Sequence, residues 1–121
     1  MLASLSGAAI AGDAPMVERD GLILAVQASG NVATFSFDTK PGYRIAAGYG
    51  VEVSAPEQDA GFWKEKLPKT IADDDRAYFD LPLTFTLSSE NNIQGHRLKF
   101  DLGICSQDEL CNRVVFSLNI P

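Results

Sequence analysis

The chain has 121 residues, a net charge of -6 and a hydrophobic content of 45%. This length suits one domain with a real core and leaves no room for a second domain. Because 16 acidic residues face 10 basic ones and no block of Lys or Arg occurs, nucleic acid is not an expected partner. No apolar run approaches the roughly 20 residues that cross a bilayer, so direct membrane insertion is not expected either.

The first 14 residues are mostly small and apolar, and Ala9-Ile10-Ala11 has the small-x-small form of a signal-peptidase site. Residues 1–14 are therefore interpreted as the remnant of a signal peptide. Because a basic n-region is missing, an N-terminal extension or a first edge strand is the alternative. Residues 15–121 are expected to form the single domain.

Apolar and polar residues alternate in run after run, as half-buried strands require, and no convincing helical pattern appears. Turn residues such as Ser29-Gly30-Asn31 and Lys40-Pro41-Gly42 separate the runs. Pro82 falls in a strand pattern, which places it at a sheet edge or at the start of its strand. The fold class is predicted to be all-β, an immunoglobulin-like antiparallel β-sandwich. The runs are 22–26, 33–37, 51–53, 81–87, 98–102 and 114–120.

The stretch from Asp59 to Asp80 differs, because it mixes Phe62, Trp63 and Leu67 with lysines and an acidic run. It is predicted to be a long loop, and long loops often carry function. Phe62 and Trp63 are equally compatible with a place in the core.

Cys105 and Cys111, the only two cysteines, form a Cys-x5-Cys pair just before the final alternating run. A disulfide that closes so short a loop removes only about 2.4 kcal/mol of chain entropy, against about 4.7 for a loop of about 100 residues. The short loop favours a dithiol that opens and closes in exchange reactions. A static bridge that pins the last hairpin is the alternative. Either bridge is easier to keep oxidised outside the cytosol, which agrees with export.

His96 is the only histidine, and with the two cysteines it offers three possible metal ligands. An exposed turn histidine is the simpler interpretation. Serine-based catalysis has no support, because no nucleophile-elbow motif accompanies this distant histidine.

Several segments together resemble the periplasmic N-terminal domains of DsbD-type thiol:disulfide interchange proteins, over most of the chain from about Val32 to Pro121. The spacing and late position of the cysteines, with a strand before them, are moderately specific, whereas Cys-x5-Cys alone would be weak. The matching segments are 40–45 (Lys-Pro-Gly-Tyr-Arg-Ile), 63–65 (Trp-Lys-Glu), 78–83 and 98–111.

The resemblance implies a monomeric periplasmic domain that passes electrons between thioredoxin-like donor and acceptor proteins, without a metal or organic cofactor. By position, Cys111 forms the mixed disulfide with the partner and Cys105 resolves it. The resemblance also implies a cap loop or partner-binding residues around the pair, with Phe62, Trp63, Leu67 and Tyr43 as the candidates. The alternative function is a non-catalytic immunoglobulin-like binding module with a structural disulfide.

The chain departs from the family pattern beside its cysteines. Asn112-Arg113 leads straight into the last strand, and Arg44 and Ala46 stand where aromatic rings are expected. Among the nearby charged residues, acidic ones would disfavour a thiolate and Arg113 would oppose them. The partners are therefore less firmly implied than the fold.

Overall fold

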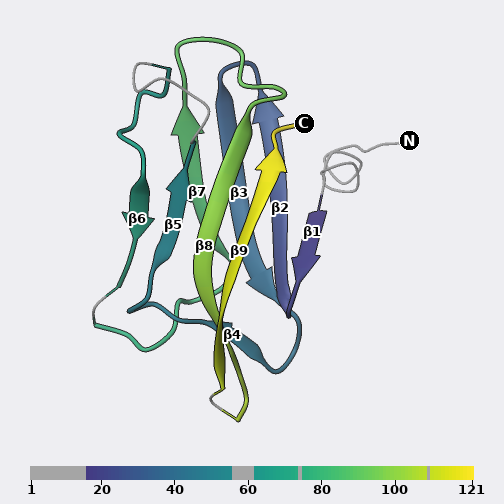
Figure 1. The fold of residues 1–121 in the computed structure, drawn as a ribbon, viewed down its shortest axis with the longest axis vertical. Coiled ribbons are helices and arrows are strands. Elements are labelled where there is room, and N and C mark those ends of the chain that lie inside the picture. The colour runs from purple at the N-terminus through teal and green to yellow at the C-terminus, as the bar shows by residue number, and fades with distance from the viewer. Residues whose placement is uncertain (1–15, 56–61, 74, 109) are drawn as a thin grey trace.

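Two antiparallel sheets pack face to face as a sandwich in the computed structural model, which describes residues 16–55, 62–73, 75–108 and 110–121 (Figure 1). The predicted all-β class and the sandwich architecture are confirmed. Within the described ranges there is no helix that could cross a membrane. The predicted N-terminal segment, 1–14, lies outside the described residues.

In the part of the chain that the structure describes, nine strands make up the two sheets. One sheet has the order β1-β2-β3-β7. In the other sheet β8 is central: β9 pairs along one of its edges, while β5 and β4 share the opposite edge, and β6 pairs with β5. The strands are β1 (Met16–Arg19), β2 (Leu22–Ser29), β3 (Val32–Thr39), β4 (Tyr43–Ile45), β5 (Val51–Ser54), β6 (Lys69–Ile71), β7 (Leu83–Ser88), β8 (Arg97–Ser106) and β9 (Cys111–Asn119).

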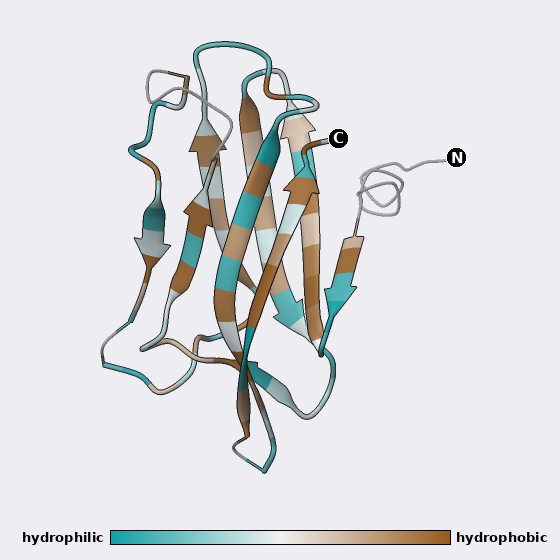
Figure 2. Ribbon diagram, viewed as in Figure 1, coloured by the Kyte–Doolittle hydropathy of each residue, from teal (hydrophilic) through white to brown (hydrophobic). Residues whose placement is uncertain are grey.

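Every second side chain along a strand points into the space between the sheets, and these side chains form the core. Along β8 this alternation appears as hydrophobic and hydrophilic bands (Figure 2), although burial is continuous from Phe100 to Cys105. A cluster of phenylalanines joins the two layers, with ring centroids 5.5 Å apart between Phe35 and Phe100 and 5.7 Å apart between Phe37 and Phe100. Such rings contribute packing beyond the area they bury. The rigid core therefore holds β8 and β9 in a fixed position.

The strands that the sequence did not predict are β1, β4 and β6, which have three or four residues each. So short a strand gives too few alternating positions to stand out from a turn. The predicted loop 59–80 contains β6, and isolated bridges tie Trp63 to Ser89 and Tyr78 to Ala46. Pro82 directly precedes β7, a strand at the end of its sheet, as predicted.

Candidate functional site

The two cysteines form a disulfide between the end of β8 and the first residue of β9. They lie directly opposite each other in the ladder, with 4.0 Å between their Cα atoms. Next to them, the backbone N–H of Ser106 donates to the carbonyl oxygen of Leu110 at 2.9 Å. Bonded and non-bonded pairs alternate in an antiparallel ladder, so the cysteines occupy a non-bonded position, where side chains come closest. The backbone already closes this hairpin without the disulfide.

The two halves of the disulfide differ in their access to solvent. Cys105 is 1% exposed, whereas Cys111 is an exposed residue on a strand at the edge of its sheet. Attack on a disulfide needs an approach to one sulfur along the bond. A protein partner can therefore approach Cys111, while Cys105 is shielded.

Cys105 is buried on the outer face of its sheet rather than in the core between the sheets. Ile104 is a member of the core cluster, and successive side chains of a strand point to opposite faces, so Cys105 points outward. Arg44 lies directly opposite Cys105 on the neighbouring strand β4 and therefore shares that face. Arg44 and the disulfide thus share the outer face at this end of the sheet.

The Arg44 guanidinium carbon lies 4.2 Å from the centroid of the Tyr78 ring, which is a cation–π contact. Backbone bonds hold the ring in place, because Phe79 N donates to Ile45 O and Ala47 N donates to Ala77 O, each at 3.0 Å. The segment around Tyr78 therefore runs alongside β4. A neutral ring supports the Arg44 side chain without cancelling its charge.

A second cluster lies on the same face, with Arg113 two positions from Cys111 along β9 and Asp101 four positions from Cys105 along β8. Arg113 donates through Nη2 to Oδ2 of Asp101 at 2.6 Å and through Nε to Oδ1 at 3.1 Å. Tyr49 donates its hydroxyl proton to Oδ1 of Asp101 at 2.9 Å. Gly103 lies between the two clusters, and a Cβ there would touch the Tyr49 side chain at 3.5 Å.

These contacts fix the charge of the cluster. The hydrogen bonds from Arg113, helped by the Tyr49 hydroxyl, lower the pKa of Asp101 below its ordinary value of 3.8, although burial opposes the shift. The hydrogen bond to Asp101 raises the pKa of Tyr49 above 10.0. Asp101 is thus ionised and paired. Arg113 balances the negative charge of Asp101, so that this carboxylate does little to disfavour a thiolate at the cysteines.

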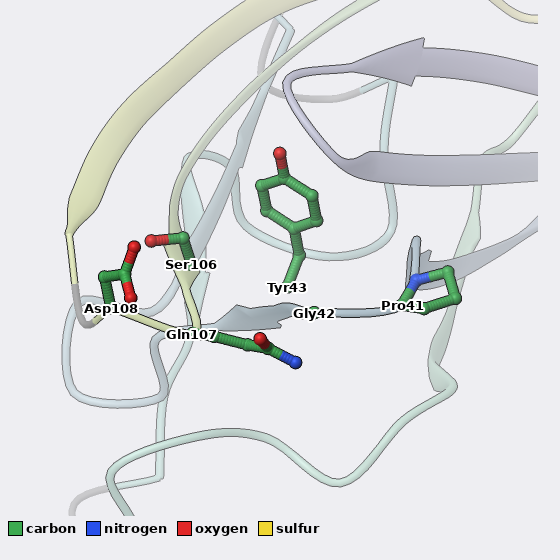
Figure 3. A pocket seen from close by; sticks show the side chains of 6 residues that line it. All are labelled: Pro41, Gly42, Tyr43, Ser106, Gln107 and Asp108. Atoms are coloured by element: carbon green, nitrogen blue, oxygen red, sulfur yellow. The ribbon is translucent and has the colours of Figure 1, made fainter.

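A shallow hollow lies beside the disulfide hairpin (Figure 3). Tyr43 lies opposite Ser106 and points to the same face as Ile45, which is the core side. Its ring closes the end of the sandwich against Gly21, where an added Cβ would come within 2.5 Å of the ring. Tyr43 therefore adjoins the disulfide hairpin but lies on the opposite face of the sheet from the disulfide. The lining residues are Pro41, Gly42, Tyr43, Ser106, Gln107 and Asp108.

The other three cap-loop candidates lie near the opposite end of the sandwich. The Phe62 ring is 4.3 Å from the ring of His96, which comes just before β8, and it packs edge-on against Trp63 at 5.1 Å. Trp63 is 5% exposed and belongs to the core. From His96 to Cys105 the extended chain covers about 30 Å. Phe62 and Trp63 would have to move along most of the sandwich to cover the disulfide.

Leu67 is also remote from the cysteines. It precedes β6, whose first residue Lys69 lies opposite Val53, and Val53 in turn pairs with Phe100 near the middle of β8. Leu67 is partly buried and packs against the core. Of the four candidates, only Tyr43 is on a strand that pairs with the cysteine end of β8.

The placement of His96 separates it from the cysteines, which would have to be its co-ligands in a metal site. The described ranges contain no group of three or more His, Cys, Asp or Glu side chains that could hold a metal ion. His96 lies between the turn at Gly95 and the start of β8, as expected, but it is half-buried rather than exposed, because its ring packs against Phe62.

Comparisons of the chain with protein-family models, with curated proteins and with solved structures gave no match. The chemistry of this chain has to be inferred from its own residues.

Arg44, Tyr78 and Tyr49 are the members of the site that the sequence did not point to. Arg44 was noted only as a departure from an aromatic pattern. Its relation to Cys105 depends on the register between β4 and β8, and β4 is too short to predict. The alternation of β8 did contain a usable signal, because it assigns Gly103 and Cys105 to the face opposite the core.

Proposed function

We propose that this domain carries out thiol:disulfide exchange through Cys111 and Cys105, passing electrons between thioredoxin-like partners. The observation that carries the proposal is the unequal exposure of the two cysteines, with Cys111 exposed on an edge strand and Cys105 buried. Exchange needs one sulfur that a partner can reach and a second that is close enough to resolve the adduct. A purely structural bridge needs no such difference.

In the proposed reduction, a thiolate of the donor attacks Sγ of Cys111. A bond forms between the donor sulfur and Cys111, the bond between Cys111 and Cys105 breaks, and Cys105 leaves as a thiolate that takes a proton from water. The second thiolate of the donor then attacks the donor's own sulfur in the mixed disulfide and releases Cys111. Two electrons have moved: the donor dithiol is oxidised to a disulfide, and the domain holds two reduced cysteines.

Delivery to the acceptor reverses these roles. The Cys111 thiolate attacks the disulfide of the acceptor, forming a mixed disulfide and releasing one acceptor thiolate. Cys105 then attacks Cys111, the domain disulfide forms again, and the acceptor leaves with two reduced cysteines. Because Cys105 lies directly opposite Cys111 in the ladder, it resolves the adduct without a rearrangement of the strands.

Arg44 is assigned a supporting role in both steps. It lies directly opposite Cys105 on the neighbouring strand and on the same outer face, and its guanidinium packs on the neutral ring of Tyr78. A nearby guanidinium favours a thiolate over a thiol. Arg44 therefore stabilises Cys105 as the leaving group when the disulfide opens.

The resemblance to periplasmic DsbD-type domains supports an exported, periplasmic location. The disulfide is compatible with an oxidising compartment. The proposed domain acts as a monomer, since it has to meet a donor and an acceptor in turn through the same sulfur.

The test is to trap the partner with single-cysteine variants. Cys105→Ala keeps the exposed Cys111, and Cys111→Ala is the matched control that keeps the buried Cys105. Each variant is mixed with a thioredoxin-like protein that lacks its resolving cysteine and carries an activated mixed disulfide. Adducts are counted by intact mass.

We expect Cys105→Ala to form a stable protein adduct and Cys111→Ala to form little. Equal yields from the two variants would contradict the assigned roles. No adduct from either variant would favour the alternative, a binding module with a static disulfide.

A further inference from the structure

Strand β9 has one edge that faces away from β8, and the register identifies the backbone groups on it. Ser106 N donates to Leu110 O at one end of the ladder, and Ile120 N donates to His96 O at the other. Bonded and non-bonded positions alternate between these ends. The even-numbered residues of β9 therefore bond to β8. Backbone N–H and C=O groups that point outward belong to Arg113, Val115, Ser117 and Asn119.

Among the described residues, the other terminal strands of the two sheets carry protective features that are missing on β9. Strand β1 has four residues, two of them the charged Glu18 and Arg19, and β6 has three residues that start with Lys69 after Pro68. Strand β7 starts after Pro82, and its end is covered where Lys64 N donates to Ser88 O at 2.9 Å. Short strands, charges, prolines and covering segments are the usual protection against strand addition.

Strand β9 is nine residues long and contains no Lys, Pro or Gly. Its one charged residue is Arg113, whose side chain is 63% exposed although it binds Asp101. Val115, on the same outer face, is an exposed apolar residue at 42%. The strand begins at Cys111, so an extended segment that pairs with β9 starts beside this exposed residue.

We propose that the exchange partner docks by adding an extended, cysteine-bearing segment to the outer edge of β9, with its cysteine opposite or next to Cys111. The inference rests on the proposed exchange function. Backbone hydrogen bonds to Val115 and Ser117 hold the segment, as in other cases of strand addition. Next to Arg113 the segment carries an acidic or neutral side chain, because a second cation there would repel that guanidinium.

The test compares two reductants of the wild-type disulfide. One is glutathione, which cannot form a strand. The other is a synthetic peptide as long as β9, with one cysteine at its end followed by alternating Thr and Val. The same peptide with Pro at every second position is the control, because it lacks the backbone donors.

Two variants block the edge in different ways. Ser117→Pro removes an outward N–H without removing a hydrogen bond to β8, and Val115→Lys places a charge on the outer face. Met16→Lys, at a 59% exposed position on the edge strand β1, is the matched control.

We expect the strand-forming peptide to reduce the wild-type disulfide faster than glutathione does. Ser117→Pro should slow the peptide by about five- to tenfold, the effect of one hydrogen bond of ordinary strength, and Val115→Lys should slow it as well, because an edge lysine disfavours strand addition; neither should change the glutathione rate. Met16→Lys should change neither rate. In the peptide adduct of Cys105→Ala, the amides of Val115 and Ser117 should become protected from hydrogen exchange, and in the glutathione adduct they should not.

Three results would overturn the proposal, each in a distinguishable way. If glutathione reacts but the β9 variants leave the peptide rate unchanged, strand addition is wrong and exchange stands. If neither reductant reacts, the proposed function fails and strand addition fails with it. If the protein forms a concentration-dependent dimer that Val115→Lys abolishes, the edge belongs to a second copy of the chain.

Discussion

The two ends of the sandwich are closed in different ways. At the end where β8 begins, Phe62 packs against Trp63 and His96, and Trp63 is almost fully buried. At the end where β8 finishes, Tyr43 closes the core against Gly21 and the disulfide lies on the outer face. The first end is stabilised by the packing of Phe62, Trp63 and His96, whereas the second end carries the disulfide.

This difference separates residues that support the fold from residues that support the proposed reaction. The aromatic segment at Phe62 and Trp63 buries apolar area far from any reactive sulfur. Arg44 and Tyr78 are half-buried but do not belong to the core, and they lie on the same outer face as the disulfide. Substitutions at the two ends should therefore have separable effects on stability and on exchange.

The largest effect is expected at the aromatic end. Trp63→Ala should lower the free energy of unfolding by about 3–5 kcal/mol, because it leaves a cavity in the core. Under conditions where the variant is folded, the rate at which glutathione reduces the disulfide should match the wild-type rate. Urea denaturation and alkylation followed by mass spectrometry measure the two quantities.

Trp63→Phe is the matched control, since the buried indole nitrogen has no hydrogen-bond partner among the described residues. We expect it to cost less stability than Trp63→Ala. A large rise in reduction rate in folded Trp63→Ala would instead mean that Trp63 covers the disulfide, as the resemblance implied.

A smaller effect is expected at Asp101, whose pKa is lower in the folded chain than its ordinary value. Just below pH 3.8 the unfolded chain binds the extra proton, so the stabilisation is present above that pH and is lost as the pH falls further. Because Arg113 is mostly exposed, Asp101→Asn should cost only about 1 kcal/mol at neutral pH.

Denaturation curves of the wild type and Asp101→Asn should converge as the pH falls from about 5 to about 2. Glu18→Gln, at an exposed carboxylate on β1 in the other sheet, is the control and should keep nearly the wild-type profile. A constant stability difference between the wild type and Asp101→Asn across that range would contradict the assignment of the charge to Asp101.

The smallest effect is expected at Arg44, on the disulfide end. Arg44→Gln should make the reduction potential more negative by about 10 mV, because the reduced form loses a cation that favours its thiolate. Arg44→Lys keeps the charge and should keep most of the potential. If Arg44→Gln and Arg44→Lys both match the wild type, the charge of Arg44 does not act on Cys105.

The sequence was sufficient for the fold class because six strands alternate over enough positions to be seen. It also placed Cys111 and Cys105 together, since they flank one tight turn. The sequence did not predict β4. Because Arg44 pairs with Cys105 through this strand, their proximity could not be predicted from the sequence either. The contact of Arg44 with Tyr78 depends on a further bridge, between Ala46 and Tyr78, within a stretch that was predicted to be a loop.

The positions of Phe62 and Trp63 could not be predicted from the sequence for a different reason. A Phe-Trp pair in a polar segment is compatible with a core anchor or with a mobile cover, and composition does not distinguish the two. The bridge from Trp63 to Ser89 decides where the pair lies, because it ties the segment to the end of the sandwich away from the cysteines.

The most direct test of the central claim is the reduction potential of the Cys105–Cys111 pair. The protein is equilibrated in thiol buffers of defined potential, and alkylated cysteines are counted by mass. Exchange predicts a value in the range of known exchange proteins, roughly -120 to -270 mV. A value below about -300 mV would show a structural bridge and contradict the account.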